Sequence, residues 1–296
     1  MTNLSGAIAI NKPEGPTSFQ TSDMVRKIFS AKKAGYVGTL DAHATGVLLV
    51  VLGKGTKLIP FLKQYTKTYR AKFRLGATSS TFDVWGDVKS HGYDGDIDRI
   101  GISQLLDSFK GEIDQIPPMF SAKSVNGKKL YKYALEGIEI PRKPNRVEIK
   151  NLELTKYNQE EGSGEFVMTC TKGTYVRSLI ADLGEKAGCG AIMTGLVRLE
   201  DSNITVGDCH TIDELEAKKG GDSLFSLITP IEQMIGHIPE IDVTEFQTKK
   251  LSNGGTIKIQ GNPAKAGYVR IMHDGNLFGV GKYALSVGEL YPERIL

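Results

Sequence analysis

Cysteine is scarce in this sequence, and its few cysteines are too scattered to serve as structural cross-links. Among 296 residues there are three, namely Cys170, Cys189 and Cys209. Their spacing matches neither a zinc-binding pattern nor a paired disulfide framework. This scarcity predicts a chain that folds without covalent cross-links, and it favours a reducing, cytoplasmic setting.

Segments that would direct the chain to a membrane are also lacking. Residues 1–10 contain no basic stretch followed by a long apolar run, so we expect no signal peptide. The longest apolar run, residues 47–52, is far shorter than the about 20 residues that a membrane-spanning helix requires. We therefore predict no membrane association.

Motifs of several common enzyme classes are missing. Gly53-Lys54-Gly55-Thr56 imitates a phosphate-binding loop, but the preceding glycine is absent and Gly55 stands in place of Ser or Thr. Neither a Gly-x-Ser-x-Gly elbow nor a Rossmann glycine fingerprint occurs. These absences argue against nucleotide hydrolases, common serine hydrolases and dehydrogenases, and we expect no cofactor. We also expect no metal centre, because no metal-ligand spacing links the five histidines, His43, His91, His210, His237 and His273.

What is present is an ordinary globular composition with a segregated charge. The chain is 40% hydrophobic and 24% charged, and its net charge is only +3. Residues 120–150, however, contain eight basic and three acidic side chains, an excess of 8 − 3 = +5, interleaved with Phe120, Tyr131 and Tyr133. Such a segment suits contact with phosphates and stacking on bases. A solvated basic surface without a ligand is the alternative interpretation.

An aspartate lies in a predicted loop before a predicted core strand. Thr17 or Ser18 can cap a helix whose apolar residues recur at positions 24, 25, 28 and 29. Residues 47–52 are short, β-branched and followed by glycine, which predicts a buried strand. Asp41 therefore lies in a glycine-bracketed loop that the scaffold can hold rigid, where catalytic side chains are frequent.

A tyrosine and an arginine complete a candidate trio. Residues 69–75 alternate strictly, which predicts a strand with Tyr69 pointing inward and the cations outward. Residues 166–171 predict another strand, followed by a helix over about 174–186 with Thr174 as its N-cap. Arg177 would then occupy the third helical position, where the helix dipole disfavours a cation. An anionic partner would explain it, although an arginine that reaches solvent remains the alternative.

The C-terminal part predicts a small β-rich unit. Residues 217–239 resemble a connecting region, and strands are expected at 255–259, 268–272 and 277–283. Asp274-Gly275 between the last two is a strong hairpin signal. A unit of about 55 residues is too small for a deep active site of its own, so we interpret it as a binding accessory.

Five ordered motifs extend along nearly the whole chain. One is the segment Gly38-Thr39-Leu40-Asp41-Ala42-His43-Ala44-Thr45-Gly46-Val47-Leu48. The other four are residues 11–18 (NKPEGPTS), 67–69 (KTY) with 75–76 and Asp83, 115–118 (QIPP) with the 121–131 segment, and 172–179 (KGTYVRSL) with 182–184 and 196–198. In this order the motifs resemble those of the TruB family of tRNA pseudouridine-55 synthases, and the segment from Gly38 to Leu48 resembles the catalytic motif of that family.

The resemblance implies an α+β fold. It predicts a catalytic domain over residues 1–236 with a mixed, largely antiparallel sheet, flanking helices and an RNA-contacting insertion at about 115–146. It also predicts a small all-β, PUA-like RNA-binding domain over residues 240–296. The implied reaction is isomerisation of uridine 55 in the T loop of tRNA, in the cytoplasm, without a cofactor and without an obligatory protein partner.

The resemblance also implies roles for single residues. Asp41 would act as nucleophile or base on a flipped uridine, Arg177 would pair with it, and Tyr69 would stack on the base. Whether Asp41 attacks the sugar or the base, or removes a sugar proton to give a glycal, stays open. Leu196 would line the pocket. Further contacts with the T-arm stem-loop are expected from Lys12, Tyr36, Lys123, Lys128, Arg146, Tyr175 and Arg198.

Several positions depart from the family's pattern. Tyr36 replaces a histidine, and Ala42 replaces the proline after the aspartate, which loosens the catalytic loop. The lysine of the insertion falls one position early, as Lys123 before Ser124, and Leu135 replaces an arginine. These departures leave the detailed tRNA contacts open, while Asp41, Tyr69 and Arg177 are retained.

Two other functions compete with this interpretation. The first is a binding role, as an RNA chaperone or as the synthase subunit of a guide-RNA particle; the absence of a lysine-rich tail before Leu296 favours a stand-alone enzyme instead. The second is a nucleotide-dependent enzyme that uses Gly53 to Thr56, for which we expect no nucleotide binding at that segment.

Overall fold

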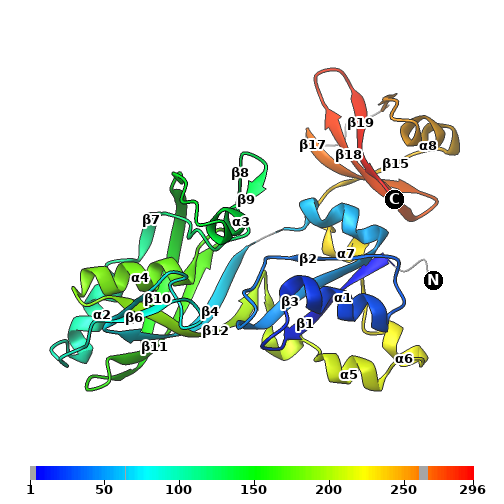
Figure 1. Ribbon diagram of the computed structural model, residues 1–296. Coiled ribbons are helices and arrows are strands. Elements are labelled where there is room, and N and C mark those ends of the chain that lie inside the picture. Colours follow the sequence, from blue (N-terminus) through cyan, green and yellow to red (C-terminus); the bar gives the residue numbers. More distant parts are fainter. Residues whose placement is uncertain (1–4, 64, 260–265) are drawn as a thin grey trace.

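The computed structural model describes residues 5–63, 65–259 and 266–296, and a large mixed sheet dominates it (Figure 1). Within these residues ten strands form this sheet: β1 (Ser5–Lys12), β2 (Ala34–Val37), β3 (Thr45–Gly53), β4 (Thr66–Leu75), β7 (Gly111–Gln115), β10 (Asn145–Asn158), β11 (Ser163–Thr171), β12 (Ala191–Asp201), β13 (Ile204–Thr205) and β14 (Thr229–Pro230).

The order of the strands divides the sheet into two halves. The path runs β14-β1-β3-β12-β4-β11-β10-β7, with β2 beside β3 and β13 beside β12. Neighbours are antiparallel except β3 and β12, which are parallel over the short register Thr45↔Val197 and Gly46↔Arg198. This short parallel pairing joins the two halves, and the Asp41 loop runs directly into it.

The half that holds β1 and β3 carries a helical layer on one face. Ile8 and Ile10 of β1 and alternate residues of β3 pack beneath α1 (Ser18–Ile28) and the short helices α5 (Ile212–Ala217) and α6 (Asp222–Phe225). Thr17 caps α1 through a capping box with Gln20, as the sequence predicted, although Met24 is exposed rather than buried. The opposite face is covered in part by the 3₁₀ helix η1 (Lys54–Phe61) and by α7 (Ile231–Met234).

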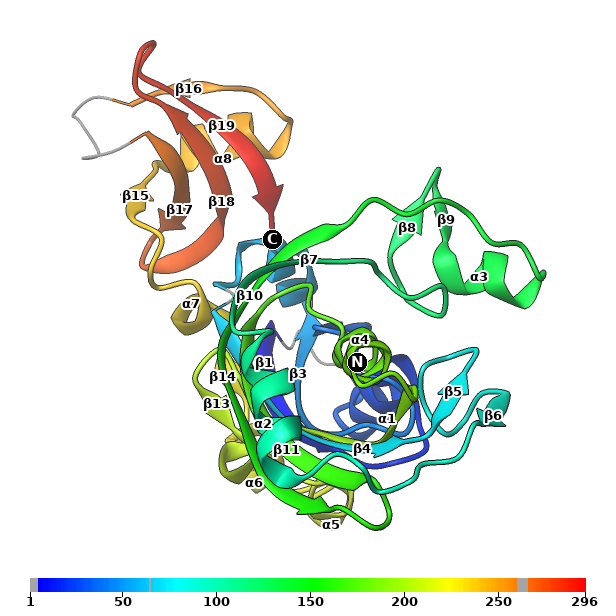
Figure 2. The same ribbon diagram turned by 90° about the vertical axis from the view of Figure 1, so that its left-hand side faces the viewer.

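The other half curves around a helix that carries the candidate arginine. In Figure 2, α4 (Val176–Lys186) lies on the concave side of the sheet, and α2 (Arg99–Asp107) packs on the same core. The alternation predicted for β4 is confirmed, because Tyr69, Ala71, Phe73 and Leu75 are buried while Arg70, Lys72 and Arg74 are exposed. Burying these alternate side chains fixes the register of β4, since a slip of one residue would expose all of them.

Two small hairpins project from this half. One pairs β5 (Ala77–Ser79) with β6 (Val88–Ser90), and the other pairs β8 (Ser124–Val125) with β9 (Lys128–Lys129), followed directly by α3 (Leu130–Leu135). Figure 2 shows the second hairpin and α3 extending away from the sheet, on the side to which α4 lies. They belong to the basic segment noted in the sequence.

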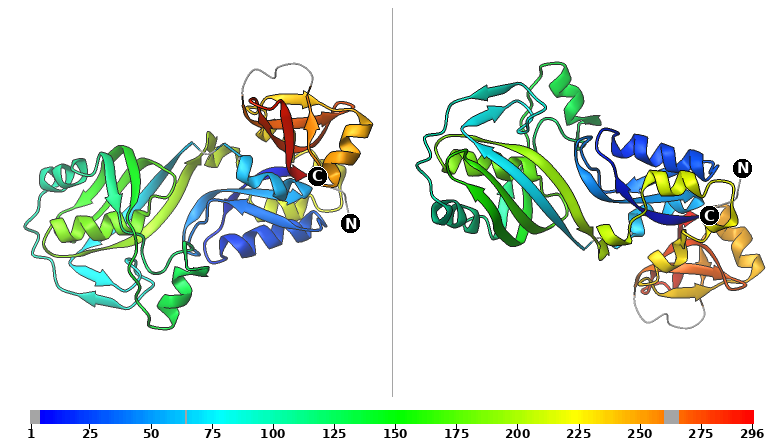
Figure 3. Two further views of the ribbon diagram at one scale, coloured as in Figure 1. Left: turned by 90° about the horizontal axis from the view of Figure 1, so that it is seen from above. Right: turned by 90° about the horizontal axis from the view of Figure 1, so that it is seen from below.

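The C-terminal residues form a separate five-stranded sheet. Its order is β15-β17-β18-β19-β16, and it packs beside the half that holds β1 and β3 (Figure 3). The Asp274-Gly275 hairpin is confirmed, with positive φ at both residues as a type I′ turn requires. The bounds are β15 (Glu240–Asp242), α8 (Glu245–Ser252), β16 (Ile257–Lys258), β17 (Gly267–His273), β18 (Asn276–Ala284) and β19 (Glu289–Ile295).

The predicted fold class, an α+β catalytic sheet with a small all-β C-terminal unit, is confirmed. The predicted connector at 217–239 was too simple, because it contains α6 and α7 and adds β14 to the edge of the main sheet. No helix of the described residues is long and apolar enough to cross a membrane.

Candidate active site

A buried lysine fixes the backbone of the loop that carries Asp41. Lys12 is fully buried, and its Nζ donates to the backbone oxygens of Pro13, Ala42 and Ala44 at 2.8–2.9 Å. Burial lowers the pKa of Lys12 to about 8, against the opposing effect of the Asp41 and Glu14 charges. Lys12 therefore holds the backbone on both sides of His43, and it is not among the residues that line the cavity beside Asp41.

Arg177 fixes the carboxylate itself. Its Nε lies 2.9 Å from Asp41 Oδ2, and its Nη2 donates to Asp41 Oδ1 at 3.2 Å. The same guanidinium donates to the backbone oxygens of Thr81 and Phe120, both at 2.8 Å. A planar fork held at four points orients the carboxylate in a way that a single-point cation cannot. The Arg177 side chain is 7% exposed and that of Asp41 is 43% exposed, so the aspartate keeps access to the cavity.

The helix that presents Arg177 begins one residue later than predicted. Its N-cap is Tyr175 rather than Thr174, whose hydroxyl instead donates to the Thr171 carbonyl. Gln115 replaces the missing side-chain cap by bonding both the N–H and the carbonyl of Tyr175. Arg177 thus occupies the second helical position, where the helix dipole disfavours a cation, and its anionic partners are Asp41 and, at 3.8 Å from its Nε, Asp83.

Asp41 opens into a cavity of about 250 Å³ between the two halves of the sheet. Tyr69, Leu196 and Tyr175 all line it, which brings three predicted site residues to the Asp41–Arg177 pair. Burial raises the pKa of Tyr69 to about 12, so its hydroxyl is protonated at neutral pH. The walls combine an aromatic ring, an aliphatic side chain and a fixed carboxylate, which suits a flat heterocycle attached to a polar sugar.

A buried ion cluster forms one wall of the cavity. Lys67 Nζ donates to Asp201 Oδ2 at 2.6 Å, and Arg198 Nη1 lies 3.5 Å from the same oxygen. Arg198 is fully buried and also donates to the backbone oxygens of Gly38 and Val47, which flank the Asp41 loop. Gly38 has a φ of 69°, which favours glycine, and a side chain there would also displace the Lys67 ammonium. The cluster therefore holds the backbone at both ends of the Asp41 loop, whereas Arg177 holds the Asp41 side chain.

Neither Lys67 nor Asp201 was singled out as a site residue from the sequence. The alternation along β4 contained a signal for Lys67. This lysine lies two residues before Tyr69 and so shares its inward face, where a cation needs a buried partner. Nothing in the local sequence of Asp201 indicates that it is this partner. Arg198, expected to contact substrate, lines the cavity but has its Nε and Nη2 committed to backbone carbonyls.

Other predicted contact residues lie outside the cavity. Tyr36 is half-buried in β2 against the core beneath α1. In the basic segment, Lys123 donates to the Asn145 side chain, and Lys128 pairs with Glu136 beside the Tyr133 ring. At the sheet edge, Arg146 forms a 2.6 Å ion pair with Glu112. None of these four residues lines the cavity beside Asp41.

Within the described part of the chain, no group of three or more His, Cys, Asp or Glu side chains could hold a metal ion. The groups that the structure brings to the cavity are a positioned carboxylate, its guanidinium partner and a protonated tyrosine.

Two solved structures have the same fold as this chain. A chain from the crystal structure of the archaeal box H/ACA sRNP Nop10-Cbf5 complex superposes with a TM-score of 0.69 at 23% identity, covering 98% of this chain and 85% of that one. A chain from a Cbf5-Nop10-Gar1 complex gives a TM-score of 0.68 at 24% identity, covering 98% of this chain and 84% of that one. Both chains share the fold of this protein over nearly its whole length.

Sequence comparison then defines the family. Residues 26–176 match the N-terminal domain of TruB family pseudouridylate synthases, residues 177–236 match the tRNA pseudouridylate synthase B C-terminal domain, and residues 239–296 match the C-terminal unit of pseudouridine synthase II TruB. The chain belongs to the TruB family of pseudouridylate synthases, which are isomerases.

Two curated relatives illustrate the similarity. The tRNA pseudouridine synthase B of Bacillus subtilis is 38% identical over 259 residues, which is 86% of this chain and 84% of that protein. The enzyme of the same name from Aquifex aeolicus is 34% identical over 293 residues, which is 99% of this chain and 100% of that protein. The predicted family is thereby confirmed.

Proposed function

We propose that this chain isomerises uridine 55 in the T loop of tRNA to pseudouridine, with Asp41 as its catalytic carboxylate. The observation that carries the proposal is the four-point anchoring of Arg177, which aims the Asp41 carboxylate into a cavity walled by Tyr69 and Leu196. The similarity to enzymes named tRNA pseudouridine synthase B supports tRNA as the substrate. We expect the reaction to take place in the cytoplasm.

The proposed reaction requires no external reactant. Asp41 acts on the flipped nucleotide, either as a nucleophile on sugar or base or as a base on the sugar, and the bond between uracil N1 and ribose C1′ breaks. The uracil turns in the cavity, and C5 bonds to C1′. The C5 proton then leaves to solvent and N1 gains a proton, so atoms and electrons balance without a cofactor.

Binding energy from outside the cavity must support base flipping. Removing a base from its stack costs on the order of a few kcal/mol, which stacking on Tyr69 offsets in part. The remainder would come from phosphate contacts with the insertion at about 115–146 and with the proposed RNA-binding unit at 240–296. We propose that the residue 1–236 domain performs catalysis and needs no protein partner.

The experiment that tests this function is tritium release from tRNA labelled at uridine C5, in EDTA, without guide RNA or added protein. We expect the parent chain to release tritium, Asp41→Asn to release none, and the matched surface variant Asp94→Asn to behave as the parent. Mapping the product should place pseudouridine in the T loop.

Other outcomes would redirect the proposal. No release by the parent, with tRNA binding intact, would overturn stand-alone catalysis and favour the guide-dependent or binding role. Release that maps outside the T loop would retain the enzyme class but overturn position 55. Release by Asp41→Asn equal to that of the parent would contradict the role of the carboxylate.

A further inference from the structure

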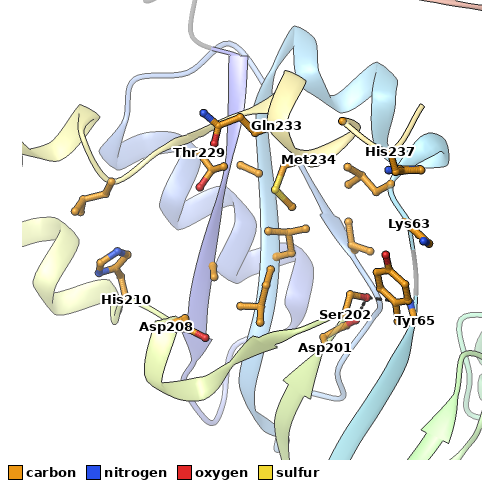
Figure 4. Close-up of a pocket in the computed structure, with 18 residues that line it drawn as sticks. Lys63, Tyr65, Asp201, Ser202, Asp208, His210, Thr229, Gln233, Met234 and His237 are labelled. Atoms are coloured by element: carbon orange, nitrogen blue, oxygen red, sulfur yellow. Dashed lines mark hydrogen bonds between the residues drawn. The ribbon is translucent and has the colours of Figure 1, made fainter. Parts of the chain in front are cut away.

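A second cavity, of about 570 Å³, lies on the face of β1 and β3 opposite α1 (Figure 4). Its floor is apolar and includes Ala7, Ala9 and Leu49, and its rim comes from the segment after β12, from residues 227–237 and from Lys63 and Tyr65. This volume falls within the range of about 300–1,000 Å³ that is typical of small-molecule sites. Neither the proposed isomerisation nor the family's motifs account for it.

The sequence of β1 explains why this face is hollow. The strand alternates small and large apolar residues, so that Ile8 and Ile10 fill the core beneath α1 while Ala7 and Ala9 face the other side. Ala9 pairs with Leu49 in the adjacent strand, and Val37 of β2 pairs with the same leucine. Alanine fills much less space than isoleucine, so the elements that cover this face leave a cavity above the pair of alanines.

The cationic side chain that lines the cavity, Lys63, lies at one end of it. Lys63 and His237 lie together there in Figure 4, with the Tyr65 ring next to them. The Lys63 Nζ is 4.5 Å from the centroid of the Tyr65 ring, and within the described residues neither Lys63 nor His237 forms an ion pair with an acidic side chain. Burial lowers the pKa of His237, and the charges of Lys63 and Arg270 lower it further. An anionic group would be stabilised at this end.

Polar side chains also line the cavity, in addition to its apolar floor. Gln233 and Thr229 both line the cavity, and Figure 4 shows them on the same side of it. A side-chain amide next to a hydroxyl offers both donors and acceptors, which is what the edge of a heterocyclic base requires. The faces of such a base are apolar enough to lie on an alanine floor.

We propose that this cavity binds a single nucleotide, with the base over Ala7 and Ala9, its edge toward Gln233, and its phosphate toward Lys63 and His237. The cavity has an apolar floor, amide and hydroxyl groups beside it and a cationic end. Together these are the features of a site for a nucleotide rather than of a site for a purely apolar ligand. The nucleotide is either a free mononucleotide or one unstacked nucleotide of the RNA substrate.

Asp201 connects the site with the wall of the catalytic cavity. Asp201 lines the nucleotide cavity, while its Oδ2 accepts from Lys67 and lies near Arg198, both of which line the catalytic cavity. Arg198 in turn holds Gly38 and Val47 beside the Asp41 loop. A nucleotide bound in the second cavity therefore lies against the wall that positions the catalytic loop.

Calorimetry on the full chain with adenosine 5′-monophosphate tests the proposal, because an adenine probe differs from the uridine that the catalytic cavity accepts. We expect one saturable site, with at least about tenfold weaker binding of adenosine, which lacks the phosphate. Lys63→Ala and Gln233→Leu should each weaken binding about tenfold, and Ala9→Phe should abolish it by filling the cavity. Lys32→Ala, a surface control, and Tyr69→Ala, which alters the catalytic cavity, should leave it unchanged.

The two sources of the nucleotide are then separated with tRNA. If the RNA supplies it, the probe competes with tRNA, and Gln233→Leu weakens tRNA binding although no charge is removed. If a free nucleotide is the ligand, probe and tRNA bind together. Only the tRNA arm rests on the proposed function. The proposal is overturned if the parent does not bind adenosine 5′-monophosphate saturably. It is also overturned if neither Lys63→Ala nor Gln233→Leu weakens binding, or if Tyr69→Ala abolishes it.

Discussion

His43 and Trp85 lie face to face, with ring centroids 4.1 Å apart and planes inclined by only 1°. His43 belongs to the loop of Asp41, and Trp85 belongs to the loop that offers the Thr81 carbonyl to Arg177. The two loops are thus joined twice, once through Arg177 and once through the ring stack. With Ala42 in the place of the family's usual proline, the stack supplies part of the rigidity that the loop sequence itself lacks.

Replacing Trp85 with alanine should therefore slow catalysis without abolishing RNA binding. An aromatic pair of this kind contributes about 0.5–1.5 kcal/mol, which corresponds to a fall in kcat of about 2- to 10-fold if the loop must be rigid to react. KM for tRNA should change less, because the pair lies away from the basic insertion. Single-turnover and steady-state kinetics on Trp85→Ala would measure both parameters.

Trp85→Phe serves as the matched control, because it preserves an aromatic ring and should recover most of the kcat. Trp85 is also the only tryptophan in the sequence, so the fluorescence of the chain reports this stack alone. His43→Leu should change that emission and lower kcat to a similar degree. Equal kcat values for the parent and Trp85→Ala would show that the stack does not position Asp41.

Arg177→Lys should reduce kcat by at least about a hundredfold although the charge is retained. A lysine ammonium has no planar fork, so it cannot hold both oxygens of Asp41 together with the Thr81 and Phe120 carbonyls. The loss corresponds to about 3 kcal/mol of transition-state stabilisation, a magnitude typical of a removed positioning contact. Tritium release under single-turnover conditions measures it, and urea unfolding shows whether the variant remains folded.

A kcat for Arg177→Lys within about threefold of the parent would mean that charge alone is sufficient. Lys186→Arg, a swap of the opposite sense near the exposed end of the same helix, is the control for nonspecific effects on α4 and should leave kcat unchanged.

Local pattern predicted those parts of the fold whose cause is local. The alternation in β4 and the capping of α1 by Thr17, one of two candidate caps, depend on neighbouring residues, and both agree with the sequence pattern. The helix position of Arg177 left two possibilities, an anionic partner or an arginine that reaches solvent, and the structure shows the first. The N-cap of α4 differs from the predicted one because the group that bonds its backbone, Gln115, lies 60 residues away in β7.

The parts that could not be predicted depend on contacts between distant segments. Asp201 meets Lys67 across 134 residues, and only the pairing of β4 with β12 brings them together. Lys12 lies within a motif and was assigned to RNA, but its burial beneath the loop follows from the packing of β1 on β3. Membership in a motif therefore does not distinguish a residue that touches substrate from one that supports the loop.

The basic insertion should contribute unequally to RNA affinity. Arg146 and Lys128 already pair with Glu112 and Glu136, whereas Lys129 and Lys132 are exposed and form no ion pair within the described residues. A cation without a protein partner is free to displace counterions from a phosphate. Lys129→Ala and Lys132→Ala should each lower the slope of log affinity against log salt by about 1, and Arg146→Ala should lower it less.

Titrations of tRNA binding at several salt concentrations would compare these variants, with Lys32→Ala on the distant α1–β2 connection as the control. Identical slopes for the parent and for the double variant of Lys129 and Lys132 would remove this surface from the RNA interface.

The buried Lys12 should make stability depend on pH in the alkaline range. Its pKa is about 8 in the folded chain and near the ordinary 10.5 when unfolded. Below pH 8 both states are charged, and the folded state bears the full cost of the buried charge. Between pH 8 and 10.5 the unfolded state binds more protons, so the free energy of unfolding rises with pH, by about 3 kcal/mol at most.

Urea unfolding of the parent and of Lys12→Met at pH 7.5 and pH 10 would isolate this contribution, because the tyrosines and other lysines titrate in both proteins. The free energy of unfolding of the parent should rise relative to that of Lys12→Met over this interval. Parallel pH profiles would mean that the three carbonyl contacts keep Lys12 charged throughout. In that case the lysine holds the Asp41 loop as a permanent cation, and kcat should show no transition near pH 8.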